Sequence, residues 1–152
     1  MVRALPAWRS GDDGLQIEAL AQALPTPLLI LTSRGLILHT NPAFDAILGS
    51  EGHTEIGRDM LRLVRADHRK QVARDWTAAI TCGNRHPFEC PLRMRQEQTI
   101  WFLLHLAPLA FGDDGMVVWI CVGFDISIYK QQSEEAEHSR LQQEIILRAS
   151  NH

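Results

Sequence analysis

The feature that most constrains the fold is a pair of long apolar runs within Thr99–Ser127. Both runs are rich in β-branched and aromatic residues, and the sequence Gly-Asp-Asp-Gly at 112–115 separates them, which is typical of an antiparallel β-hairpin. Side chains alternate between the two faces of a strand, and here both alternating sets are largely apolar. A sheet with one hydrated face would alternate apolar with polar residues, so we expect both faces of these strands to be covered.

Alternation also predicts which side chains of the hairpin share a face. One set is expected to point toward the helices of the domain: Phe102, Leu104, Ile120 and Val122. The other set is expected to point away from them: Trp101, Leu103, Val117 and Trp119. Helices on one side cannot cover the second set, and two exposed tryptophans would form the kind of patch that marks an interface. That face therefore needs a terminal helix or a second subunit.

A second hairpin and a short helix are predicted upstream. Apolar runs at 28–32 and 36–40 flank a turn that contains a glycine, as in a hairpin. Asn41 is the expected N-cap of the helix that follows, because Pro42 suits the first helical position and Gly49 suits the end.

The middle of the chain predicts two more helices and a strand. A short helix is expected over 59–64, and Asp67 is the expected N-cap of a longer one. Val72 and Trp76 belong to an apolar stripe at helical spacing on that longer helix. Residues 88–95 are expected to form a strand that pairs with the run beginning at Thr99.

Both ends of the chain carry extensions. Residues 1–12 lack periodicity and are expected to be flexible, whereas 13–24 predict an amphipathic helix and 128–152 a polar helix. The stripe of the first helix consists of Ile17, Leu20, Ala21 and Leu24. Packing of this stripe on the chain's own sheet and packing across a dimer remain open alternatives.

Three motifs resemble the PAS domains of bacterial signalling proteins. The last predicted strand ends in Asp125-Ile126-Ser127, similar to the Asp-Ile-Ser/Thr that precedes the C-terminal helix of that family. Asn41, Ala43 and Phe44 match its Asn-x-Ala-Phe segment, and Ile-Gly-Arg at 56–58 matches the segment before its short helix. The resemblance implies an α+β PAS fold over 25–127, with a five-stranded antiparallel sheet and helices on one face.

The resemblance also implies where function resides. PAS domains hold ligands between sheet and helices, and the candidate pocket residues here are Asn41, Phe44, Ile47, Leu61, Val64, Trp76, Phe88, Phe102, Leu104, Ile120 and Val122. The alternative is that these side chains fill the space themselves. Signal transmission to the C-terminal helix is expected at Asp125, Ile126 and Ser127.

The expected function is that of a cytoplasmic sensory and dimerisation module. The dimer is expected to use the stripe of the N-terminal helix and the outward set of the hairpin. The end of the chain, 149–152, resembles the linker of PAS proteins that continue into a GGDEF-type diguanylate cyclase. The alternatives are the PAS module of a histidine kinase, or a stand-alone sensor that binds haem or a small hydrophobic ligand.

Composition and motifs weigh against several other classes. A net charge of −3 gives no electrostatic case for a nucleic-acid partner, and no apolar run is long enough to insert into a membrane. No catalytic motif and no metal-ligand spacing is present, so we expect neither an enzyme nor a metal site. His68 is the nearest candidate for a haem ligand, although an exposed position is favoured. No cysteine lies where a light sensor with a cysteinyl-flavin adduct would need it. The sequence does not identify a cofactor: absence of a cofactor is favoured, and haem or a small apolar ligand is the alternative.

Overall fold

The computed structural model describes residues 12–49, 55–81, 87–93, 98–110 and 117–150. The elements, in chain order, are α1 (Asp12–Ala23), β1 (Leu28–Thr32), β2 (Ile37–Thr40), α2 (Pro42–Leu48), the 3-10 helices η2 (Met60–Leu63) and η3 (Ala66–His68), α3 (Arg69–Thr81), β3 (Phe88–Arg93), β4 (Thr99–Ala110), β5 (Val117–Asp125) and α4 (Ser127–Ser150). The five strands form one sheet in the order β2-β1-β5-β4-β3, and every neighbouring pair is antiparallel. The predicted α+β architecture is confirmed.

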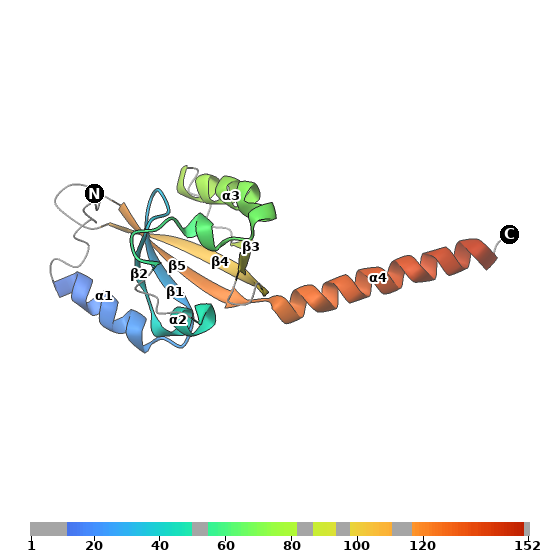
Figure 1. The fold of residues 1–152 in the computed structure, drawn as a ribbon, viewed down its shortest axis with the longest axis horizontal. Helices are drawn as coiled ribbons and strands as arrows, with labels where there is room; N and C mark the ends of the chain where they lie inside the picture. Colours follow the sequence, from blue (N-terminus) through green and yellow to red (C-terminus); the bar gives the residue numbers. More distant parts are fainter. Residues whose placement is uncertain (1–11, 50–54, 82–86, 94–97, 111–116, 151–152) are drawn as a thin grey trace.

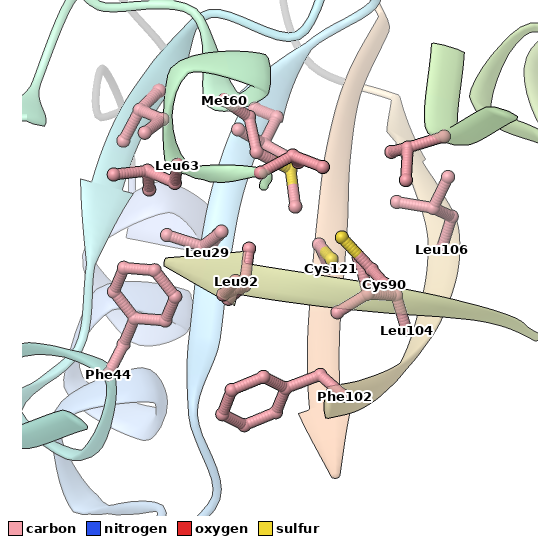
Figure 2. Packing of buried hydrophobic residues seen from close by; sticks show 14 of the residues in the cluster. Leu29, Phe44, Met60, Leu63, Cys90, Leu92, Phe102, Leu104, Leu106 and Cys121 are labelled. Carbon is pink, nitrogen blue, oxygen red and sulfur yellow. The ribbon is translucent and has the colours of Figure 1, made fainter. Parts of the chain in front are cut away.

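The sheet separates two hydrophobic clusters of unequal size. The larger one lies between the sheet and the segments α2, η2 and α3, and we call this side the inner face. Phe44, Met60 and Phe102 point into this space from different elements, as Figure 2 shows. The smaller cluster lies under α1, which covers the opposite, outer face, so α1 and α3 lie on opposite sides of the sheet (Figure 1).

The N-terminal helix packs on the sheet of its own chain. Ala21 is buried, and Ile17 and Leu24 pack beside it against outer-face residues of β1 and β2. Leu20, the remaining member of the predicted stripe, is 61% exposed. The stripe is therefore divided, with three members facing the sheet and one facing solvent.

The predicted faces of β5 are wrong. Ile120 and Val122, expected in the inner pocket, belong to the outer cluster beside α1. Trp119, expected on the outer face, is buried in the inner cluster, and Val117 shares its side by alternation. The cause is the register: β4 pairs with β5 so that Ala107 lies opposite Ile120, and a shift of one residue exchanges the two faces.

The faces of β4 agree with the prediction. Phe102 and Leu104 point inward, whereas Trp101 and Leu103 lie on the opposite side and are half-buried. The connection into α3 differs from the prediction. Asp67 lies inside η3 and does not cap α3, which begins at Arg69.

Asn41 joins the helices to the sheet. As predicted, its side chain caps α2, with Oδ1 accepting from Phe44 N at 3.0 Å. The same oxygen accepts from Leu28 N at 2.9 Å, while Nδ2 donates to the carbonyls of Ala21 at 3.0 Å and Thr26 at 2.8 Å. The Asn41 amide is fully buried and its oxygen and nitrogen are occupied within the chain, so it does not serve as a pocket residue.

Candidate functional site

The junction between β5 and α4 is held by one residue of β4. Ile126 N donates to Trp101 O at 2.8 Å, and Trp101 N donates to Ser127 Oγ at 3.1 Å. Asp125 Oδ1 accepts from Ser127 N at 2.9 Å, which caps the first turn of α4. The predicted junction residues thus attach α4 to the backbone of Trp101.

The side chain of Trp101 contacts side chains from two other segments, α4 and the segment before α3. Lys130 Nζ of α4 lies 4.4 Å from the ring centroid, and the Arg65 guanidinium lies at 5.4 Å. The His68 ring meets the indole edge-on at 5.1 Å. Lys130 also pairs with Glu89 of β3 at 2.9 Å. We call Arg65, His68, Glu89, Trp101 and Lys130 the junction cluster. It connects the segment before α3 to the first turn of α4.

The segment before α3 runs along the edge of β3 that does not pair with β4. Val64 and Leu92 form an isolated antiparallel bridge, and Arg65 N donates to Pro91 O at 2.9 Å. A covered edge cannot template pairing with another chain. This pairing also brings Arg65 within reach of Trp101.

His68 occupies a polar setting outside the inner cluster. Its Nδ1 lies 3.1 Å from Asp67 Oδ1, and Arg65 Nε lies 2.7 Å from the same carboxylate oxygen. Hydrogen bonds from Arg65 and then His68 lower the pKa of Asp67 to about 2. The His68 ring faces Trp101. The residues present therefore do not fit a haem held through His68 in the interior.

The interior between sheet and helices is filled. Phe44, Phe102 and Leu104 line a residual cavity of about 10 Å³, at the lower limit for a single water molecule. Of the predicted pocket residues, these three and Val64 are buried in the inner cluster; those packed against it and partly buried are Ile47, Leu61, Trp76 and Phe88. In this structure the side chains fill the space themselves, which is the alternative stated in the sequence analysis.

A more open hollow than the interior cavity lies between the β1–β2 turn, η2 and α3. It has a volume of about 310 Å³, and we call it the turn cleft. Leu61 and Trp76, both predicted pocket residues, line it together with Met60 and Val72. Arg34 and Asp59 contribute its charged groups.

Two cysteines lie in the inner cluster. Cys90 and Cys121 are fully buried, and Figure 2 shows both side chains in the apolar layer. Burial, with a smaller contribution from Asp75, raises the pKa of Cys90 to about 12, and burial also raises the pKa of Cys121. Both remain neutral thiols near neutral pH and lack the thiolate character that nucleophilic chemistry requires.

Two further properties hold for the described part of the chain. No three side chains of His, Cys, Asp or Glu gather there as metal ligands. No helix in it combines the length and the apolar character that a membrane span requires.

Sequence reasoning missed several members of both sites. No local sequence pattern indicated Glu89, Arg65 or Lys130, because these residues come together only through contacts between distant segments. Trp101 was expected at a dimer contact. Arg34 and Asp59 were not considered as a pair, because only the tertiary contact between the turn and η2 brings them to the same cleft.

The chain is similar to known sensory domains. A family model of the PAS fold matches residues 15–126. The LOV protein of Rhodobacter sphaeroides superposes with a TM-score of 0.67 at 18% identity, covering 76% of this chain and 68% of its own. A sensory box histidine kinase/response regulator from Burkholderia thailandensis gives 0.64 at 17% identity, over 85% of this chain and 98% of that chain.

A ligand-bound domain is also among the similar structures. The PAS domain of the RpfR quorum-sensing receptor from Cronobacter turicensis, in complex with C12:0, gives a TM-score of 0.58 at 20% identity, over 68% of this chain and 95% of its own. No curated protein sequence matches the chain. The family match covers well over half of the sequence and coincides with the five-stranded sheet and its helices. The chain therefore belongs to the PAS family.

Proposed function

We propose that this chain is a non-enzymatic, cytoplasmic sensory module that dimerises and regulates an output domain linked to α4. The observation that carries the proposal is α4 itself, which has 24 residues and no buried side chain. It projects away from the domain (Figure 1), and Lys130 and Ser127 attach its first turn to Trp101. A helix fixed at one end and free along the rest can transmit a change at its base to whatever follows it.

The exposed apolar residues of α4 support a paired helix. Those most exposed are Ile128, Tyr129, Leu141, Ile145, Ile146 and Leu147. An isolated helix gains little from such residues in water, whereas a second copy of the helix would bury them.

The outer face of the sheet supports the same dimer. Leu20 of α1 is 61% exposed and Phe124 of β5 is 47% exposed. Phe124 lies opposite Leu103 in the β4–β5 ladder, on the side that α1 leaves partly open. Pairing two outer faces would bury these residues and bring two α4 helices together, as a twofold dimer requires.

For the output we propose a diguanylate cyclase. The support is the resemblance of 149–152 to the linker that precedes GGDEF domains. The similarity to a histidine kinase/response regulator supports the second candidate, a kinase output. The reading frame beyond residue 152 distinguishes the two, since a cyclase would show a GGDEF-type sequence and a kinase would show a phosphoacceptor histidine.

Sedimentation of the purified chain tests the dimer. We expect a dimer at tens of micromolar, an order-of-magnitude concentration for weak dimers, and a shift toward monomer for Leu20→Glu. Leu20 is exposed within the chain, so the substitution leaves the core intact. Gln16→Glu, also exposed on α1, adds the same charge and is the matched control. A monomeric parent chain, or equal effects of both variants, would contradict the proposal.

Regulation is tested in the protein that contains the output domain. Trp101→Ala removes the ring that contacts Lys130 and Arg65, so we expect output activity to lose its dependence on the state of the PAS domain. Arg74→Ala, on the exposed side of α3, is the control. Unchanged regulation in the folded Trp101 variant would count against transmission through α4.

The alternative of a stand-alone binding protein has weaker support. The RpfR domain was solved in complex with C12:0, which shows that a similar fold can hold that ligand. In this chain the interior cavity of about 10 Å³ cannot accept such a chain without moving the core side chains. Haem binding by His68 lacks support for the reason given above.

A further inference from the structure

We propose that the turn cleft is a binding site for a small zwitterion with an apolar side chain, such as an aliphatic or aromatic amino acid. The site is separate from the interior between sheet and helices. The volumes distinguish the two places, since the interior cavity holds about 10 Å³ and the turn cleft about 310 Å³. The latter equals roughly ten times the ~30 Å³ that a water molecule occupies in the liquid, which suits a molecule of the size of leucine.

The floor and one wall of the cleft are apolar. Met60 and Val72 are buried at its base, while Leu61 and Trp76 are half-buried at its sides. Such a surface gains free energy when an aliphatic or aromatic group replaces water.

The walls of the cleft are fixed before any ligand arrives. Trp76 Nε1 donates to Ser33 O at 3.1 Å, and Trp119 Nε1 donates to Ser33 Oγ at 3.0 Å. The turn is also joined to η2, because Met60 N donates to Gly35 O at 2.8 Å. Gly35 itself has φ of +84°, a conformation that side-chain-bearing residues rarely adopt. A preformed site loses less entropy on binding than a flexible one.

Two opposite charges border this apolar surface. Arg34 makes no hydrogen bond or ion pair with any residue that the structure describes. Asp59 Oδ1 accepts one hydrogen bond, from Leu61 N at 2.9 Å, and its carboxylate retains further acceptor sites. Asp59 also lies close to the turn, since a Cβ at Gly35 would be 3.5 Å from Asp59 Oδ1. Yet Arg34 and Asp59 do not pair with each other.

Charge complementarity selects the class of ligand. A simple anion would be attracted by the Arg34 guanidinium but repelled by the Asp59 carboxylate. A simple cation would be attracted by Asp59 but repelled by Arg34. A zwitterion presents a carboxylate to Arg34 and an ammonium to Asp59, and both contacts are charge-assisted hydrogen bonds. The apolar side chain of the same molecule then covers Trp76 and Leu61.

Binding of this ligand would be the input signal for the sensory role proposed above. The biological meaning of the binding rests on that role. The binding itself needs neither the dimer nor the output domain. A chain that dimerises without binding, or binds without dimerising, therefore separates the failure of one proposal from the failure of the other.

Calorimetric titration of the full chain with L-leucine, isocaproate and isoamylamine tests the site. Isocaproate lacks the ammonium and isoamylamine lacks the carboxylate, so we expect each to bind at least about tenfold more weakly than leucine, as loss of one charge-assisted hydrogen bond implies. No heat with leucine at millimolar concentration, or equal affinity for leucine and either analogue, would overturn the proposal.

Variants locate the binding. Arg34→Gln lies at an exposed turn and leaves the core intact, and Asp59→Asn keeps an acceptor for Leu61 N. We expect each to weaken leucine binding about tenfold or more, and Ala73→Leu, which fills the cleft, to abolish it. The matched controls are Arg74→Gln and Ala46→Leu, both exposed and outside the cleft. Unaltered binding in folded Arg34→Gln and Ala73→Leu would refute this location.

Discussion

Replacement of Asn41 by alanine tests the connection that joins α1, β1 and α2. The Asn41 side chain accepts from Leu28 N and Phe44 N and donates to the carbonyls of Ala21 and Thr26, and it is fully buried. Alanine removes these hydrogen bonds, together with the longer one from Nδ2 to Leu24 O at 3.5 Å, and leaves a small space in their place. No other described side chain caps α2.

The size of the effect follows from these contacts. Loss of an N-cap costs about 1 kcal/mol, and a buried amide left without an acceptor, here Leu28 N, costs about 1–3 kcal/mol. The carbonyls of Ala21 and Thr26 lose donors as well, at a smaller cost because carbonyls tolerate partial satisfaction better. We therefore expect Asn41→Ala to lower the free energy of unfolding by about 3–4 kcal/mol, a large part of the ~5–15 kcal/mol typical of a domain.

Urea unfolding followed by circular dichroism measures this loss, and Asn41→Ser separates its parts. A serine hydroxyl can still cap α2 through Phe44 N but cannot reach the carbonyls of α1, so we expect about 1 kcal/mol less destabilisation than for alanine. Hydrogen exchange should quicken in α1 in both variants. A loss below about 1 kcal/mol for Asn41→Ala, with α1 exchange unchanged, would refute the reasoning.

Three further predictions concern the junction cluster, the core thiols and acid stability. A double-mutant cycle with Glu89→Gln and Lys130→Met should give a coupling of at most about 1 kcal/mol that shrinks in salt, because both side chains are partly exposed; about 3 kcal/mol would contradict this. With the third cysteine replaced by serine, Cys90 and Cys121 should resist a thiol-specific disulfide reagent at pH 8 until the chain is unfolded; reaction in the native state would show that the core opens. The pKa of Asp67 is lowered to about 2, so its contribution to stability is present above about pH 4 and is lost as pH falls toward 2; Asp67→Asn should flatten this part of the stability–pH curve, and an unchanged curve would contradict it.

Local chemistry made much of the fold predictable from the sequence. The N-cap Asn41, Pro42 at the first helical position and Gly49 at the end define α2 within nine residues, and Gly49 ends the helix with a φ of 65°. The turn glycine Gly35 behaves in the same way. Such signals depend on neighbours in the chain, and tertiary packing then reinforces them.

The local sequence could not predict which side chains of β5 lie on which face of the sheet. Both alternating sets of that strand are apolar, so composition does not distinguish a residue that faces α1 from one that faces α3. Only the pairing register with β4 decides it, and a one-residue change exchanges Trp119 with Ile120. Trp119 fits the inner side because its indole nitrogen finds Ser33 Oγ.

The candidate sites, too, were predictable only where they depend on local sequence. The Asp-Ile-Ser sequence at 125–127 marked the junction correctly. Its contact with Trp101 and the ion pair between Glu89 and Lys130 join residues far apart in the chain, so no local pattern predicts them. The position of the hollow was also unpredictable. Whether Phe44 and Phe102 enclose or fill a space depends on differences of a few ångströms in packing, which no sequence pattern records.

The two candidate sites are connected through α3. The turn cleft contacts Val72 and Trp76 in the middle of this helix, and Arg65 and His68, just before its first residue, contact Trp101. A ligand can bias α4 only if it binds more tightly to one of two positions of α3. The filled interior favours such a response, because a close-packed layer transmits the displacement of a helix instead of absorbing it. Since no side chain of α4 is buried, the interactions of its first turn with Trp101 and Glu89 are the place where that bias would act.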